Sequence, residues 1–115
     1  MLKTRTDGLV GLQLDYAVLL SVAPETFKSP ADLVELVARY PYSTNPLYGG
    51  PIIERDKIAT MWAVHSHQWV AYWSHPSLRT TKENRQVGPT LLIAAMRCLV
   101  TNTFGDAIEL PKELL

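Results

Sequence analysis

Residues 88–100, GPTLLIAAMRCLV, decide the fold of this chain. The Gly88-Pro89-Thr90 sequence is a helix start signal, and Gly105 is the residue expected to end the helix in the left-handed conformation. Between Leu91 and Val100 only Arg97 is polar. A helix that is apolar on nearly all sides must pack as a central element or against another subunit, and its one guanidinium must find a partner or reach water.

Strand-like runs precede this helix. Residues 58–64 and 68–73 are rich in apolar and aromatic side chains, and residues 65–67 join them, so the pattern predicts a β-hairpin with a three-residue connection. Residues 74–87 are polar and without periodicity, which predicts an irregular, mobile loop. Residues 107–110 predict a short strand before Pro111.

The N-terminal part predicts two helices. The first covers residues 7–23 and is capped by Thr6 or Asp7. Gly8 and Gly11 each lower helix propensity by up to about 1 kcal/mol relative to alanine, which indicates close backbone packing or a later helix start.

Ser29 and Pro30 signal the second helix, which ends at Tyr40. A strand over residues 33–39 is the competing interpretation. Residues 41–51 have the composition of a loop, and residues 52–56 have the pattern of an edge strand that leaves it.

Together these elements predict an α+β fold, with a small antiparallel sheet centred on the hairpin and two or three helices packed on one face. The chain has 115 residues, of which 47% are hydrophobic and 19% charged, so we expect residues 1–115 to form one domain. No internal repeat or low-complexity tract is visible.

Charge and targeting signals narrow the function classes. The 11 basic and 11 acidic residues cancel, and basic residues are only modestly enriched between Arg55 and Arg97, so nucleic-acid binding is not favoured. Residues 1–24 lack the pattern of a secretory signal, and no apolar run is long enough to span a membrane. Cys98 is the only cysteine, which excludes an internal disulfide framework. We therefore expect a cytoplasmic protein.

The three histidines lie close together in the sequence, at His65, His67 and His75. His65 and His67 would share one face if a strand continued through them. They fall where the hairpin should turn, and no cysteine accompanies them, so an exposed hairpin tip is favoured over a metal site.

Glu54, Arg55 and Arg97 are the polar candidates. In a strand, Glu54 and Asp56 would point to one face and Arg55 to the other, as solvated charges or as a carboxylate pair. Arg97 on the apolar helix needs an anion. We expect Glu54 to supply it as a structural ion pair, with a pocket for a polar ligand as the alternative.

Aromatic side chains concentrate around the hairpin and the loop before it. Tyr42, Tyr48, Trp62 and Trp69 are the binding candidates among them, because Tyr and Trp dominate contact surfaces. The sequence contains no P-loop, dinucleotide-binding turn or catalytic triad pattern, and it indicates no cofactor.

The chain resembles the NinX-like family of small phage-encoded proteins. The resemblance rests on residues 9–18 (LVGLQLDYAV), on Tyr42-Ser43 leading to residues 49–55 (GGPIIER), and on residues 88–98 (GPTLLIAAMRC). Leu91 stands where the family often has a proline, and residues 23–40 have no recognised counterpart. The resemblance implies a phage or prophage origin and a bacterial cytoplasm, and it implies no biochemical activity.

The leading hypothesis is therefore a phage accessory protein that binds a phage or host protein through residues 42–55 and nearby aromatics. The apolar last helix and the aromatic residues also suggest a homo-oligomer. The alternatives are a small-molecule-binding protein or enzyme with a pocket near Glu54, Arg55 and Arg97, and a weak single-stranded nucleic-acid binder. No motif specific to an enzyme supports catalysis.

Overall fold

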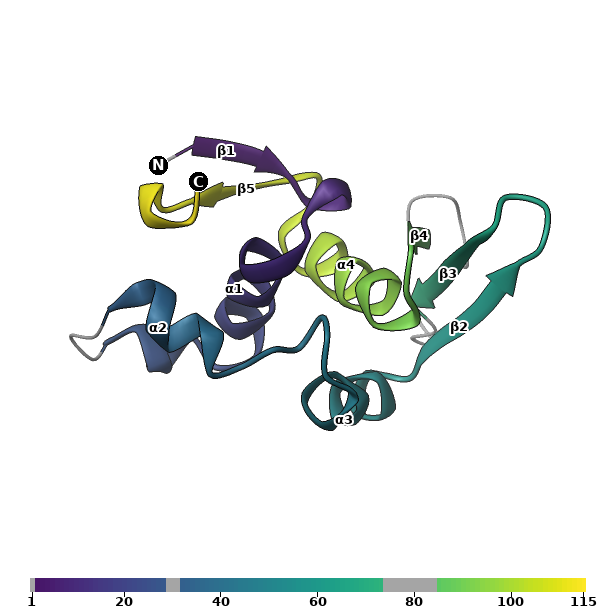
Figure 1. Cartoon of the computed structure of the whole chain (residues 1–115), viewed down its shortest axis with the longest axis horizontal. Helices are drawn as coiled ribbons and strands as arrows, with labels where there is room; N and C mark the ends of the chain where they lie inside the picture. The colour runs from purple at the N-terminus through teal and green to yellow at the C-terminus, as the bar shows by residue number, and fades with distance from the viewer. Residues whose placement is uncertain (1, 29–31, 74–84) are drawn as a thin grey trace.

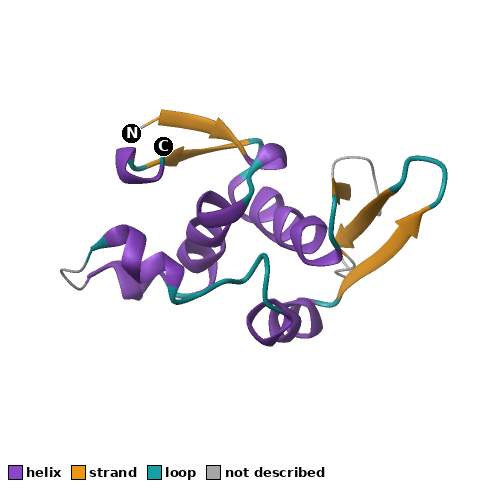
Figure 2. Ribbon diagram, in the orientation of Figure 1, coloured by secondary structure: helices purple, strands orange, loops and turns teal. Residues whose placement is uncertain are grey.

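The computed structural model describes residues 2–28, 32–73 and 85–115 (Figure 1). Within these residues, four α-helices and two small antiparallel sheets contribute to one hydrophobic core (Figure 2). One sheet has the strand order β2-β3-β4 and the other pairs β1 with β5. The α+β class and the sheet centred on the hairpin are confirmed, and the second sheet is an addition to the predicted architecture.

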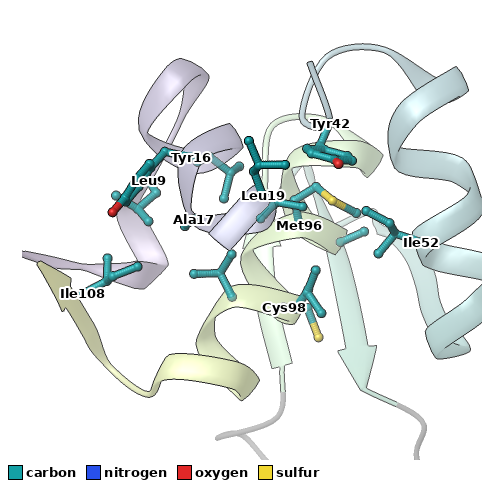
Figure 3. Packing of buried hydrophobic residues seen from close by; sticks show 14 of the residues in the cluster. Leu9, Tyr16, Ala17, Leu19, Tyr42, Ile52, Met96, Cys98 and Ile108 are labelled. Atoms are coloured by element: carbon teal, nitrogen blue, oxygen red, sulfur yellow. The ribbon is translucent and has the colours of Figure 1, made fainter. Parts of the chain in front are cut away.

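Helix α4 (Leu91–Phe104) is the central element. Thr90 caps its start, because Thr90 Oγ1 accepts a hydrogen bond from the Ile93 N–H at 3.1 Å, and Gly105 follows its end with φ of +86°. The helix contacts α1, α3 and all three strands of the larger sheet. Met96 lies among core residues of α1 and α3 (Figure 3). The apolar sides of α4 are thus covered within one chain.

Helix α1 (Gly11–Val22) packs against α4. The predicted start at residue 7 is wrong, because Thr6–Gly8 forms a 3₁₀ turn and the helix begins at Gly11, where φ is +57°. This is the later start that the glycines indicated. Glycine adopts such a φ more readily than residues that carry a Cβ.

The smaller sheet joins the two ends of the chain (Figure 1). Strand β1 (Leu2–Arg5) pairs antiparallel with β5 (Ala107–Leu110), and Leu2 lies opposite Leu110. The prediction of a strand over residues 107–110 is confirmed, whereas β1 was not predicted. The 3₁₀ helix Lys112–Leu114 follows β5.

Helix α2 (Leu33–Ala38) follows the 3₁₀ helix Pro24–Lys28. Its cap is Asp32, whose Oδ1 accepts a hydrogen bond from the Glu35 N–H at 3.1 Å. The predicted start at Ser29 and Pro30 lies outside the described residues. The alternative of a strand over residues 33–39 is wrong.

Helix α3 (Pro46–Asp56) replaces the predicted loop and edge strand. Asn45 caps it by accepting the Leu47 N–H on Oδ1 at 3.0 Å, and Lys57 ends it in the left-handed conformation. Pro51 lies inside the helix. The sequence signals failed here because two glycines and a proline lower helix propensity, and packing of Ile52 into the core overrides that preference.

The larger sheet contains β2 (Ile58–Ala63), β3 (Gln68–Trp73) and β4 (Arg85–Gly88). Ile58 lies opposite Trp73 and Trp62 opposite Trp69, and on this face Ile58, Trp69 and Trp73 pack against the core, whereas Trp62 is exposed. The connection has four residues, Val64–His67, and not three, because Ala63 pairs with Gln68. His67 closes it with φ of +52°.

The prediction of an irregular loop over residues 74–87 is wrong for its last three residues. Residues 85–87 belong to β4, which contradicts the expected absence of regular structure there, and residues 74–84 lie outside the described residues. Four-residue strands that include a charged residue are difficult to predict from periodicity. In the described part of the chain, no helix has the length and apolarity required to cross a bilayer.

Candidate functional site

The side chains singled out from the sequence occupy separate places in the fold. Tyr42 precedes α3, which carries Tyr48 and the polar pair Glu54 and Arg55. Trp62 and Trp69 face each other across β2 and β3, and Arg97 lies on α4. The predicted site residues therefore lie in three places, at α3, on the hairpin and on α4.

Three tyrosine rings gather where the α2–α3 connection meets α3. Tyr42 stacks on Tyr40 with ring centroids 6.1 Å apart, and Tyr48 meets Tyr42 edge-on at 6.2 Å. Tyr42 is buried, whereas Tyr40 and Tyr48 are half-buried. Burial raises the pKa of Tyr42. The nearby Tyr40 and Asp15 raise the same pKa further, and Arg55 lowers it. We call Tyr40, Tyr42 and Tyr48 the tyrosine cluster.

Gly49 lets α3 approach the tyrosine cluster closely. A Cβ at this position would lie 2.5 Å from the Tyr42 carbonyl oxygen and 2.8 Å from Leu92 Cδ2. Real side chains do not tolerate such distances, so any other residue would push α3 away from Tyr42 and α4. The glycine is therefore part of the geometry that positions Tyr48 beside Tyr42.

A buried carboxylate anchors the tyrosine cluster from α1. Asp15 is only 4% exposed, and its Oδ1 accepts a hydrogen bond from the Ser43 N–H at 2.8 Å. Burial raises the pKa of Asp15, and its contacts with Ser43 oppose the rise. The sequence analysis assigned Asp15 no role. The available signal was one acidic residue inside the apolar run 14–20, LDYAVLL.

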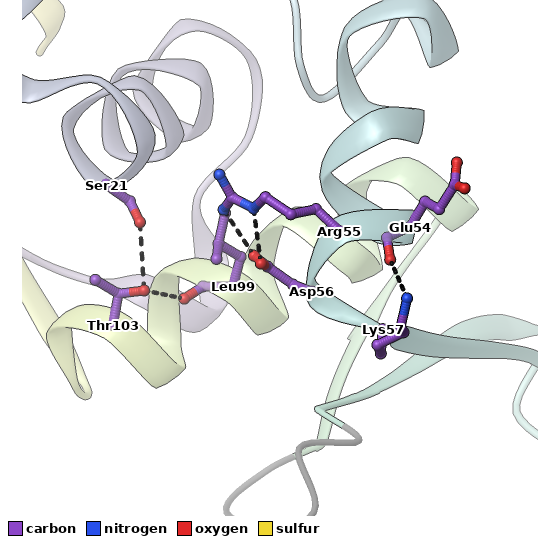
Figure 4. A network of polar contacts seen from close by, with 7 residues as sticks. All are labelled: Ser21, Glu54, Arg55, Asp56, Lys57, Leu99 and Thr103. Atoms are coloured by element: carbon purple, nitrogen blue, oxygen red, sulfur yellow. Dashed lines mark hydrogen bonds and ion pairs between the residues drawn. The ribbon is translucent and has the colours of Figure 1, made fainter.

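Arg55 and Glu54 lie at the exposed end of α3 (Figure 4). Arg55 binds Asp56 with two hydrogen bonds, Nε to Oδ1 at 2.8 Å and Nη2 to Oδ2 at 2.9 Å. The main-chain carbonyl of Glu54 accepts the Lys57 Nζ at 3.4 Å, and its side chain is exposed. The predicted alternation of Glu54 and Asp56 on a strand face is wrong, because both residues are helical.

Arg97 has partners that differ from the predicted Glu54. Its Nε donates to the Leu9 carbonyl at 2.9 Å and its Nη1 to the Val87 carbonyl at 2.9 Å. Burial lowers the pKa of Arg97, and the negative charge of Asp7 opposes this effect. The expected Glu54–Arg97 ion pair is wrong. Main-chain carbonyls satisfy the guanidinium, so Arg97 connects the start of α1 to β4.

Glu54, Arg55 and Arg97 therefore do not converge on one space. Arg55 is engaged with Asp56, Glu54 faces solvent, and Arg97 reaches toward other elements. Within residues 2–28, 32–73 and 85–115 there is no pocket. The arrangement of these three side chains gives no support to a polar ligand site.

Trp62 and Trp69 form an aromatic pair on the hairpin. Their ring centroids are 5.6 Å apart at an interplanar angle of 66°, and the His67 ring lies 6.4 Å from Trp62. His65 and His67 are exposed in the turn, and His75 lies outside the described residues. Where the structure describes the chain, no group of three or more His, Cys, Asp and Glu residues could hold a metal ion.

Cys98 is buried on α4, and burial raises the pKa of its thiol to about 12. The Asn102 Nδ2 lies 3.6 Å from its Sγ. A thiol with this pKa stays protonated at neutral pH and is a poor nucleophile. Cys98 therefore acts as a core residue.

The segments that build these sites match a known family. A sequence profile of the family described as Bacteriophage P22, NinX matches residues 5–103. The chain belongs to the NinX family. This confirms the resemblance seen in residues 9–18, 42–55 and 88–98. None of the curated proteins matches the chain.

The NinX match includes the tyrosine cluster, its anchor Asp15, Arg55 and the whole larger sheet, whereas β5 lies beyond it. Membership of the NinX family shows a phage-encoded protein.

Proposed function

We propose that this NinX family protein is a phage or prophage accessory protein that acts in the bacterial cytoplasm by binding a phage or host protein. The observation that carries the proposal is the tyrosine cluster. Tyr40 and Tyr42 precede α3, and Tyr48 lies on this helix together with Arg55. Tyr48 and Arg55 are seven residues apart on α3, so they lie on one face of the helix.

The composition of this surface is that of a protein interface. Tyr and Arg are enriched among the residues that contribute most binding energy, because they combine large apolar area with hydrogen-bonding groups. Leu47 is next to Tyr48 and is 76% exposed, which adds apolar area to the same end of α3. Arg55 forms an ion pair with Asp56, so this surface presents no unpaired charge from Arg55 to a partner.

The tyrosine cluster is also fixed before any partner arrives. The ring contacts among the tyrosines, the Asp15–Ser43 bond and the close approach at Gly49 all restrict it. A rigid surface loses little conformational entropy on binding, which favours affinity.

The test is affinity purification of the tagged protein from a phage-infected lysate, compared with the double variant Tyr48→Ala, Arg55→Ala. We expect a specific protein that copurifies with the wild type and is lost from the variant. With the purified partner, calorimetry should show a dissociation constant raised by about a hundredfold, because two residues of this kind contribute about 1–2 kcal/mol each.

The matched control is the double variant Tyr72→Ala, Arg85→Ala. It removes the same residue types from neighbouring positions of β3 and β4, where Tyr72 lies opposite Arg85. It should retain the partner. A partner that survives the Tyr48, Arg55 change, or that both double variants lose equally, contradicts the proposed surface.

Neither alternative function gains a specific observation. The polar ligand site required Glu54, Arg55 and Arg97 to converge, and they do not. The nucleic-acid interface required a basic face, but Arg55 is paired with Asp56 and Arg97 bonds to main-chain carbonyls. Arg79 and Lys82 lie outside the described residues.

A further inference from the structure

One carboxyl group lies in the core of this protein. Asp15, on α1, is 4% exposed, and its Oδ1 accepts a hydrogen bond from the Ser43 N–H at 2.8 Å. Ser43 is 1% exposed, and its Oγ has no hydrogen-bond partner among the described residues. A carboxyl group and a hydroxyl are thus enclosed together where α1 meets the segment that carries Tyr42.

The contact between Asp15 and Ser43 links α1 to the tyrosine cluster. Among the described residues, it is the only hydrogen bond that joins α1 to residues 40–56. The other main-chain hydrogen bonds of residues 41–45 are local to this segment. A change at Asp15 therefore acts first on the turn that positions Tyr42.

No cation balances a charge on Asp15 in the described part of the chain. Burial raises the pKa of Asp15, and the two contacts with Ser43 oppose the rise. Tyr42 is the titratable group that responds to Asp15, since the carboxylate raises the pKa of Tyr42. Other titratable groups on the elements around α1 do not act on the pKa of Asp15: Glu25 and Lys28 before α2, Glu35 and Arg39 on α2, Arg55 and Asp56 on α3, and Arg97 and Cys98 on α4.

An ionised Asp15 is unfavourable in this place. A carboxylate that leaves water needs a cation or several hydrogen-bond donors, because a surrounding of low polarity disfavours the charge. The Ser43 hydroxyl serves both forms of Asp15, since it donates to a carboxylate and accepts from a carboxylic acid. The closed packing therefore holds the proton more tightly than an arrangement in which water reaches Asp15.

We propose that Asp15 is a proton-dependent anchor of the tyrosine cluster. As a carboxylic acid it holds the turn of residues 41–45 closed on α1. When Asp15 gives its proton to water, the turn opens more often and the carboxylate becomes hydrated. Linkage sets this direction, because ionisation favours the arrangement that binds the proton less tightly. The opening is local, so the tyrosine cluster separates from α1 while the rest of the fold persists.

The consequence for binding rests on the proposed function. A tyrosine cluster that is held closed is preorganised for a partner, so the protonated form of Asp15 favours binding and the ionised form weakens it. The anchor itself is measured on the purified chain without a partner. Its failure is therefore distinguishable from the failure of the proposed binding surface.

Carbon-13 NMR of the side-chain carboxyl groups measures the titration of Asp15 directly. We expect one aspartate signal that titrates clearly above pH 3.8, the ordinary pKa of this side chain, and that is missing from Asp15→Asn. Asp106→Asn is the matched control, because Asp106 is exposed and its substitution removes the same charge. An Asp15 signal that titrates at or below the ordinary value overturns the proposal.

Thermal unfolding of Asp15→Asn has a pH dependence of defined sign. Asparagine keeps the Oδ1 acceptor for the Ser43 N–H and carries no charge. Between the ordinary pKa and the raised pKa of Asp15, the unfolded chain has lost the proton and the folded chain retains it, so the wild type loses stability as the pH rises. We expect Asp15→Asn to melt about 4 °C or more above the wild type at pH 7, with a difference that shrinks toward pH 4.

Amide hydrogen exchange at Ser43 measures the opening of the turn. We expect the Ser43 N–H to exchange about tenfold faster in the wild type than in Asp15→Asn at pH 7. The Thr6 N–H, which donates to the Asp106 carbonyl outside this region, should differ less between the two chains. Equal exchange at Ser43, or an Asp15→Asn chain that melts below the wild type at pH 7, overturns the proposal.

Discussion

The two sheets of this protein are both small and antiparallel, but their edges are of different kinds. Both strands of the β1–β5 sheet carry charged side chains, and the sheet ties the two ends of the chain together. The β2–β3–β4 sheet has one edge with a charge and one with none. The comparison shows that, among the described residues, one sheet joins the two ends of the chain with charged strands, while the other has one edge strand, β2, that carries no charge.

The largest expected effect comes from the residue that connects the regions of the two sheets. Arg97 bonds to the Leu9 carbonyl, which follows β1, and to the Val87 carbonyl of β4. Arg97→Met keeps the aliphatic stem but leaves both carbonyls without their donor. We expect a loss of about 2–4 kcal/mol in the free energy of unfolding, measured by denaturant titration.

Arg39→Ala is the control for Arg97. It removes an exposed arginine whose ion pair with Glu35 joins neighbouring turns of α2, and it should cost at most about 0.5 kcal/mol. Equal midpoints for Arg97→Met and the wild type would show that the connection between the two regions does not stabilise the fold.

Glycine substitutions give the second test. A Cβ at Gly88, in β4, would lie 2.8 Å from the Ala94 nitrogen, whereas a Cβ at Gly8, after β1, would meet nothing within 4 Å. Gly88→Ala should therefore destabilise the protein by about 1–3 kcal/mol through overpacking. Gly8→Ala should change the melting temperature little, because it adds no clash and lowers the entropy of the unfolded chain. Similar melting curves for both variants would contradict the close contact of β4 with α4.

The smallest effect concerns the charges of the β1–β5 sheet. Lys3 lies opposite Glu109 in the register, so Lys3→Glu creates a like-charge pair. We expect a loss of about 0.2–1 kcal/mol that decreases at high salt, as measured by urea titrations at two ionic strengths. Lys3→Gln, which removes the charge without creating repulsion, should lie between this variant and the wild type. A salt-independent loss would mean that Lys3 acts through packing.

The candidate residues named from the sequence lie on several elements, and their role stays a prediction. The sequence singled out Tyr42, Tyr48 and Arg55, and in the structure Tyr42 precedes α3, Tyr48 lies in its first turn and Arg55 in its last. The sequence-based prediction of the partner of Arg97 was wrong, because the acceptors are main-chain carbonyls of Leu9 and Val87, and a main-chain acceptor leaves no pattern in the sequence. The sequence analysis also assigned no role to Asp15, whose partner is a main-chain N–H 28 residues away.

Local chemistry determined the elements that the sequence predicted correctly. The Thr90 cap, the apolar body of α4, the Gly105 stop and the alternating hairpin are all encoded within a few neighbouring residues, and family membership could be recognised from short motifs. Tertiary structure decided the rest. Helix α3 forms despite Gly49, Gly50 and Pro51 because its packing into the core outweighs low propensity. Strand β1 pairs with β5 at the other end of the chain, and β4 pairs with β3, so neither short strand is specified by its own residues.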